Sequence, residues 1–180
     1  MSTRCVALLR GINVGSAKRV AMADLRRIVA GLGYDDPRTL LNSGNVVFGL
    51  GSGTAREAGA RIEQAIATEL GVTKRVVALK GRHLAAAVAA NPLAHVATDP
   101  ARLQVLVCGD PKALARLKPL EAEDWTPEAL VVAPRVAWLW CAGGVADSRL
   151  GAAVHRLLGD QGTARNLATM MKIVALVEGR

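Results

Sequence analysis

Two spacings of apolar residues alternate along the first half of the chain, and each predicts a different kind of element. Residues 4–9 form a continuous apolar run after Arg4, which is typical of a central strand. Residues 22–32, and the stretch that follows the capping box Thr54-Ala-Arg-Glu57, place apolar residues three and four apart, as amphipathic helices do. Further strands are predicted at residues 39–41, 46–48 and 74–79. The predicted order of this half is β-α-β-β-α-β.

The second half repeats this order without visible sequence similarity to the first. After a linking helix at 81–90, strands are predicted at 102–108, 130–132, 136–141 and 163–166. Helices are predicted after Asp110-Pro111, at 150–158 with Asp147 as the cap, and at 167–177. The pattern predicts an α+β fold of two tandem ferredoxin-like (βαββαβ) plaits. The expected segments are a first subdomain at 1–80, a linking helix and loop at 81–101, and a second subdomain with a C-terminal helix at 102–180.

Composition adds the expected environment. The 180 residues are 51% hydrophobic and 21% charged, which is typical of a globular protein. No apolar run approaches the ~20 residues that span a bilayer, so we expect no membrane association and a cytoplasmic location. Cys5, Cys108 and Cys141 are widely spaced and include no Cys-x-x-Cys pair. We therefore expect buried thiols in a reducing compartment, and neither a metal nor a cofactor.

The predicted topology brings two polar segments of the first half together. In a βαββαβ sheet the loop after the first strand and the hairpin between the second and third strands lie at the same end. These segments are residues 10–19 and 42–45. Glycines there allow amide N–H groups to face an anion, and cationic and amide side chains supply further donors. The candidate ligand-binding residues are Arg10, Gly11, Asn13, Gly15, Lys18, Ser43, Gly44 and Asn45.

The same reasoning gives a second polar cluster in the second half. The loop at 142–149 follows the third strand, and Arg165-Asn166 ends the fourth. Ser148, Arg149, Arg165 and Asn166 are therefore further candidate ligand-binding residues. Whether the two clusters share a groove depends on how the halves dock.

Known catalytic motifs do not fit the chain. Three residues separate Gly11 from Gly15, and Lys18 does not follow the second glycine directly, so the spacing is not that of a P-loop. Ser43 is not in a Gly-x-Ser-x-Gly elbow. The acidic residues Glu121, Glu123 and Asp124 lie in a polar connection, where solvated loop charge is the better interpretation. No nucleophile or general base is identified, and catalysis is left open.

Charge and aromatic residues favour three function classes. The net charge is +8, and residues 1–80 hold 12 Lys and Arg against 6 Asp and Glu. Binding of a small anionic or phosphorylated ligand is the preferred hypothesis. Trp138 and Trp140 lie on one face of a strand, so an RNA or single-strand binding module is an alternative. The preferred interpretation of the two tryptophans is an interface between the halves or between two subunits. The third class is therefore a structural or interaction protein, or a dimer, with no ligand.

Several motifs also resemble one protein family. The segments Leu9-Arg-Gly-Ile-Asn-Val-Gly15, Asn42-Ser-Gly-Asn-Val-Val-Phe48, Trp138-Leu-Trp-Cys141 and Thr163-Ala-Arg-Asn166 resemble a bacterial family known as domain of unknown function 1697. The resemblance implies tandem α/β plaits and implies no activity. The chain departs from the family pattern at Asn42, where glutamine is usual. It also departs at Gly151 in the Ser-Lys-Leu-Thr motif, and at Leu167 and Ala168 in the Arg-Asn-Trp-Asn-Thr motif.

Overall fold

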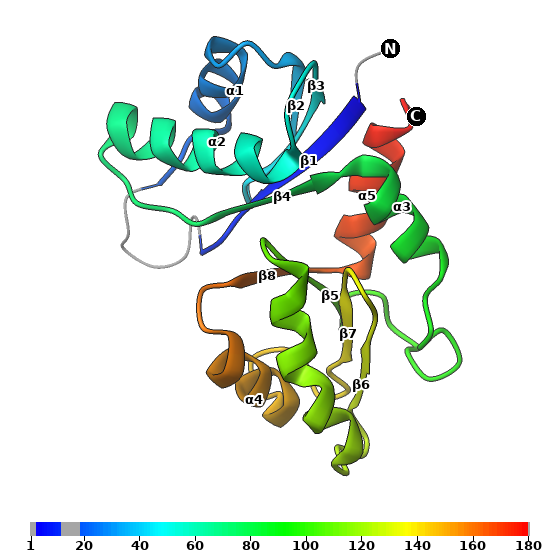
Figure 1. Ribbon diagram of the computed structural model, residues 1–180. Coiled ribbons are helices and arrows are strands. Elements are labelled where there is room, and N and C mark those ends of the chain that lie inside the picture. Colours follow the sequence, from blue (N-terminus) through cyan, green and yellow to red (C-terminus); the bar gives the residue numbers. More distant parts are fainter. Residues whose placement is uncertain (1–2, 12–18, 180) are drawn as a thin grey trace. The chain divides into compact units, whose positions relative to one another are not determined.

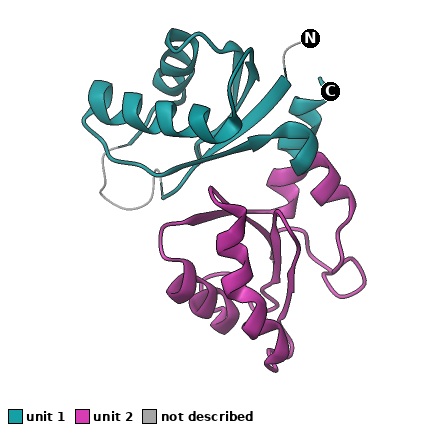
Figure 2. Ribbon diagram, viewed as in Figure 1, with its two compact units in different colours: residues 1–84, 172–180 teal, residues 85–171 magenta. Residues whose placement is uncertain are grey.

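The computed structural model describes residues 3–11 and 19–179, which form two compact units (Figures 1 and 2). The first unit comprises residues 1–84 and 172–180, and the second comprises residues 85–171. The chain passes between them within α3 (Gly81–Ala89) and returns within α5 (Leu167–Val177). Residues 172–180 thus belong with the first unit, although the sequence pattern assigned them to the second half.

The first unit contains a four-stranded antiparallel sheet in the order β2-β3-β1-β4. Its elements follow the predicted sequence, with wider bounds for most strands. They are β1 (Thr3–Leu9), α1 (Met22–Gly31), β2 (Asp35–Leu40), β3 (Asn45–Leu50), α2 (Ala55–Leu70) and β4 (Val76–Lys80). The predicted capping box is present, because Thr54 Oγ1 accepts from Glu57 N–H at 3.2 Å and Glu57 Oε2 accepts from Thr54 N–H at 2.7 Å.

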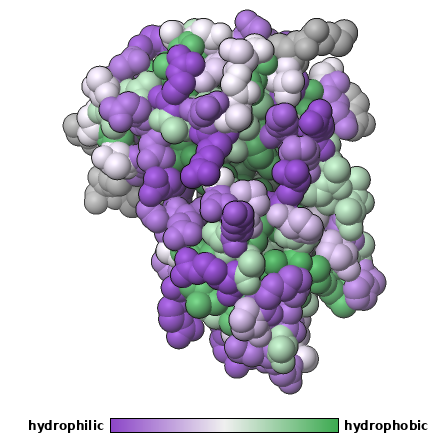
Figure 3. Space-filling model, viewed as in Figure 1, coloured by the Kyte–Doolittle hydropathy of each residue, from purple (hydrophilic) through white to green (hydrophobic). Residues whose placement is uncertain are grey.

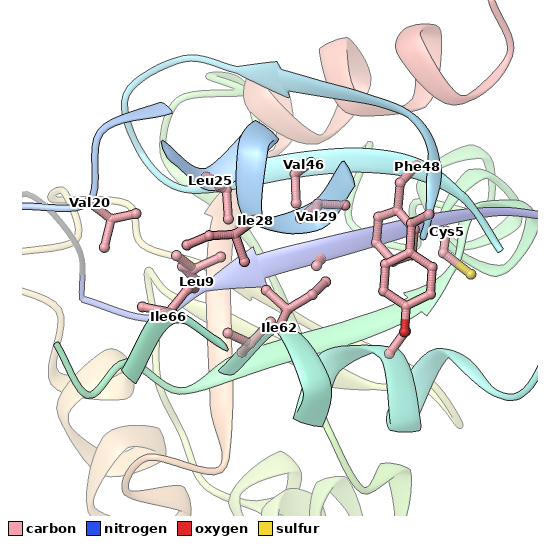
Figure 4. Close-up of a cluster of buried hydrophobic side chains, with 14 of the residues drawn as sticks. Cys5, Leu9, Val20, Leu25, Ile28, Val29, Val46, Phe48, Ile62 and Ile66 are labelled. Atoms are coloured by element: carbon pink, nitrogen blue, oxygen red, sulfur yellow. The ribbon is translucent and has the colours of Figure 1, made fainter. Parts of the chain in front are cut away.

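Apolar side chains on one face of this sheet pack against α1 and α2 (Figure 4). Alternate residues of β1 supply Cys5 and Leu9, and β3 supplies Val46 and Phe48. The helices contribute Leu25, Ile28, Val29, Ile62 and Ile66 at helical spacing, and all of these are buried. This core fixes the position of β1 and therefore of Arg10 and Gly11 at its end.

The second unit also contains a four-stranded antiparallel sheet, in the order β6-β7-β5-β8. Its elements are β5 (Leu103–Cys108), the 3₁₀ helix η1 (Pro111–Ala122), β6 (Ala129–Val132), β7 (Ala137–Trp140), α4 (Arg149–Leu158) and β8 (Gly162–Asn166). Leu114, Leu117, Leu150 and Val154 pack on one sheet face, next to Leu139. The predicted mixed α+β architecture is therefore confirmed.

Two local predictions were wrong, the cap of α4 and the start of β2. Ser148, rather than Asp147, caps α4, since its hydroxyl accepts from Gly151 N–H at 2.8 Å and the helix begins at Arg149. The helix predicted after Asp110 is present with Asp110 as its N-cap, and it is a 3₁₀ helix with Pro119 inside it, a residue that has no amide N–H to donate. Strand β2 begins four residues earlier than predicted, at Asp35, where Asp36 forms ion pairs with arginine side chains. Among the described residues, no helix is long and apolar enough to cross a bilayer.

Candidate functional site

Three segments of the first unit lie side by side at one end of its sheet. The N–H of Leu9 donates to Gly44 O at 2.8 Å, which joins the end of β1 to the turn between β2 and β3. The N–H of Arg10 donates to Arg75 O at 2.9 Å, which joins the same point to the residues before β4. Arg10 and Gly11 thus lie between the hairpin and the start of β4. We call this set, comprising residues 10–11, 41–44 and 74–75, the basic edge.

Lys74 and Arg75 were not among the predicted site residues. The sequence pattern placed both inside a strand at 74–79, but β4 begins at Val76, so they precede it at the basic edge. Lys74 Nζ donates to Gly11 O at 2.9 Å, and Arg75 forms a 3.1 Å ion pair with Glu63 of α2. The predicted topology could have located them. The fourth strand runs antiparallel to the first, so the residues just before it lie beside the residues just after the first strand.

The hairpin side of the basic edge is held by its own polar side chains. Asn45 is 1% exposed, and its Nδ2 donates to Leu40 O and to Ser43 Oγ, both at 2.9 Å. Gly44 in the turn has φ +72°, and Gly11 after the neighbouring strand β1 has φ +58°. Glycine adopts these positive φ values without steric cost. Asn45 and Ser43 therefore fix the turn. Of the other predicted residues, Asn13, Gly15 and Lys18 lie outside the described part of the chain.

The electrostatics of the basic edge favour anions. Arg10 at the end of β1 lies beside Lys74 and Arg75, which precede β4, so three cationic residues lie close together. One carboxylate, that of Glu63, is paired with Arg75. Such an arrangement stabilises oxyanions.

The predicted second cluster is assembled in the second unit, but its residues serve mainly the backbone. The pairing of Leu103 with Trp140 and of Gln104 with Asn166 puts the ends of β7 and β8 at the same sheet end. Ser148 caps α4, and Asn166 Oδ1 accepts from Thr169 N–H at 2.9 Å in the first turn of α5.

The two arginines of this cluster differ in exposure. Arg165 donates to Thr163 Oγ1 at 3.0 Å and to Ala164 O at 2.8 Å, and burial lowers its pKa to about 10. Arg149 is exposed. The contacts of Arg165 with neutral oxygens order the end of β8. Of the two predicted arginines, Arg149 is therefore the one whose side chain is exposed to solvent.

The acidic residues around η1 border a cavity of about 230 Å³, and most of their carboxylates accept from nearby backbone amides. Glu121 accepts from Val132 N–H at 2.6 Å, Asp124 from Thr126 N–H at 2.9 Å, and Glu128 from Leu150 N–H at 3.0 Å. The carboxylates of Glu121 and Glu128 thus organise the outer edge of β6 and the start of α4.

The three thiols are free and buried, as predicted. Burial, assisted by the nearby carboxylate of Asp110, raises the pKa of Cys108 to about 11. Burial also raises the pKa of Cys5 and of Cys141. In the described part of the chain, no group of His, Cys, Asp and Glu side chains is placed to hold a metal ion.

Trp138 and Trp140 are buried, with exposed fractions of 1% and 7%. Stacking on nucleic-acid bases requires an accessible ring face. Both indoles are largely covered in this structure, and the proposed roles of the two tryptophans stay predictions.

A solved structure has the same fold over nearly the whole chain. It is described as the structure of conserved bacterial protein SP0830 from Streptococcus pneumoniae, and it is 24% identical in sequence. The match covers 98% of this chain and 99% of that one, with a TM-score of 0.78. A search of curated proteins found no match.

The sequence also matches a family model. The model describes a protein of unknown function (DUF1697) and matches residues 2–138, which hold the basic edge, both hairpin strands and most of the second sheet. The match covers more than half of the chain, so the protein belongs to the DUF1697 family.

Proposed function

We propose that this protein binds a small anionic or phosphorylated ligand at the basic edge. The observation that carries the proposal is the pair of backbone bonds, Leu9 N–H to Gly44 O and Arg10 N–H to Arg75 O. These bonds hold Arg10 within one strand spacing of both the hairpin turn and the cations that precede β4. Strands lie about 4.8 Å apart, so a phosphate group beside Arg10 is about one strand spacing from the hairpin turn on one side and from Lys74 on the other.

The contacts of Lys74 support a site that is partly preorganised. Its ammonium group donates to Gly11 O at 2.9 Å and retains two further N–H donors. The same contact holds the peptide that leads into residues 12–18, where the sequence supplies Asn13, Gly15 and Lys18 as further candidates. Preorganised donors reduce the ordering cost of binding.

We also assign both units to the ferredoxin-like class. The support is the strand order β2-β3-β1-β4 in one sheet and β6-β7-β5-β8 in the other, with the chain order βαββαβ in each unit when η1 is counted as the first helix. In this class the loop after the first strand and the hairpin share one sheet end, as the proposed site requires.

The test is thermal stabilisation by orthophosphate, tripolyphosphate, sugar phosphates and nucleotides. A ligand at about 100 times its Kd adds roughly 2.7 kcal/mol to the free energy of unfolding. Arg10→Ala and Lys74→Ala should reduce the stabilisation, and raising the salt concentration should weaken it. The matched control is Arg82→Ala, which removes an equal charge from an exposed position on α3. The proposal is wrong if no anion stabilises the protein, or if Arg10→Ala and Arg82→Ala behave alike.

A further inference from the structure

Leu41, the first residue of the β2–β3 turn, has an unusual backbone conformation for a leucine. Its φ is +57°, and 49% of the residue is exposed. Bulky L-residues avoid this left-handed region because Cβ approaches the following carbonyl oxygen, and glycine or asparagine is the usual choice. The turn imposes the conformation, since four residues join the paired Leu40 and Asn45 and the bond from Asn45 Nδ2 to Leu40 O closes it.

Local structure does not explain why leucine occupies this position. Among the described residues, two that are not glycine have positive φ, Asp36 and Leu41. Asp36 makes ion pairs with Arg4 at 2.8 Å and Arg38 at 3.0 Å. Leu41 makes no such polar contact among the described residues and leaves half of its surface in water. Polar residues cover most of the face shown in Figure 3, and four large apolar residues of the described chain are exposed: Leu41, Val96, Val145 and Met171.

The place of Leu41 in the sheet suggests what its side chain contacts. Strands β2 and β1 are separated by β3, so Leu41 after β2 and Arg10 after β1 are about 10 Å apart at the same sheet end. Backbone strain that persists beside a binding site is often part of that site. A ligand whose anionic group lies at Arg10 and Lys74 reaches Leu41 only if it is longer than a phosphate ion.

We propose that the ligand is a phosphate ester with an apolar group about 10 Å from its phosphate, and that Leu41 contacts this group. The inference rests on the proposed function, because it assigns the other end of the ligand at the basic edge. Covering the exposed half of a leucine side chain strengthens binding by about five-fold. Nucleotides and alkyl phosphates both meet the description, so the experiment compares them.

The experiment measures Kd by calorimetry for two matched ligand pairs, ATP against inorganic tripolyphosphate and hexyl phosphate against orthophosphate. Leu41→Ala keeps the strained backbone and removes most of the apolar surface, whereas Leu41→Met keeps the surface. Val145→Ala removes a similarly exposed apolar side chain from the second unit and is the matched control. Leu41→Asn tests the strain separately, because asparagine tolerates positive φ and should raise Tm by about 2 °C.

The expected result is that at least one ester binds about five-fold more tightly than its inorganic partner. Leu41→Ala should abolish this advantage, while Leu41→Met and Val145→Ala retain it, and the ester that shows it identifies the apolar group. If both inorganic anions bind as tightly as their esters, or if the advantage survives Leu41→Ala, the inference is overturned and the proposed function stands. A Tm unchanged by Leu41→Asn removes the strain argument. If neither esters nor inorganic anions bind, the proposed function itself fails.

Discussion

Replacing Gly81 with alanine should destabilise the protein, because a methyl group at this position meets the end of α5. A Cβ built on Gly81 lies 2.5 Å from Val177 Cγ1 and 3.2 Å from Arg4 O. Valine is stiff about χ1 and Arg4 O belongs to the backbone of β1, so neither neighbour moves easily. Glycine at the first position of α3 therefore permits the close approach of the C-terminal helix within the first unit.

The size of the effect is set by two opposing contributions. Overpacking of this kind costs about 1–3 kcal/mol. Alanine in a helix is favoured over glycine by about 0.5–1 kcal/mol, which offsets part of that cost. We expect Gly81→Ala to lower the free energy of unfolding by about 1–2 kcal/mol. Val177→Ala removes the clashing methyl groups, so the double variant should be more stable than the sum of the two single changes predicts, by about 1 kcal/mol.

Urea unfolding followed by far-ultraviolet circular dichroism gives these differences, because the helices and strands of the first unit contribute to this signal, whereas all three tryptophans lie in the second unit. The matched control is Gly31→Ala, also in a helix, where no described atom lies within 4 Å of the added Cβ. This control should be neutral or stabilising by about 0.5–1 kcal/mol. If Gly81→Ala is as stable as Gly31→Ala, or if the double variant shows no coupling, α5 does not pack against the start of α3.

Three further predictions concern buried or paired polar groups. Although partial burial opposes it, the bonds from Lys118 and from Val132 N–H hold the pKa of Glu121 below its ordinary value of 4.5. Its stabilising contribution is therefore present above pH 4.5 and is lost as pH falls through the lower folded value, so Glu121→Gln should flatten the acid limb of urea midpoints measured from pH 3 to 7. Asn45→Ala should cost about 1–3 kcal/mol in thermal or urea unfolding, because it strips the bonds that close the hairpin, and an unchanged stability would contradict that role. With a pKa of about 11, roughly one Cys108 thiol in a thousand is ionised at pH 8, so a disulfide reagent should label it slowly in the native protein and rapidly in urea.

Most of the fold was readable from the sequence because each element carries its own local signal. The period of the apolar residues located most of the strands and helices, and Thr54-Ala-Arg-Glu57 located the start of α2. Strand β2 was predicted too short, because Asp35, Asp36 and Pro37 have the composition of a turn. Pairing with β3 and the ion pairs of Asp36 hold these residues in the sheet, and neither contact leaves a local pattern.

The candidate site was readable only in part, because it depends on element ends. Topology alone predicted that Arg10 lies beside the hairpin. Lys74 and Arg75 were missed through a two-residue error at the start of β4, since a boundary at 74 puts them inside a strand and one at 76 puts them at the basic edge. The conformation of Leu41 was beyond prediction, because the register of the hairpin imposes it and leucine carries no signal for positive φ.

Most of the short polar side chains among the predicted site residues contact the neighbouring backbone. Short amide and hydroxyl side chains reach their own neighbouring backbone, and Asn45, Ser148 and Asn166 all do so. Because the same residue types mark turns, caps and binding sites, their presence near strand ends has little value for locating a ligand. Lysine and arginine extend past the turns that they flank, and at the basic edge they come from two segments more than sixty residues apart. The binding proposal therefore depends on cations gathered by the sheet, which is why it predicts a negatively charged ligand and a marked sensitivity to salt.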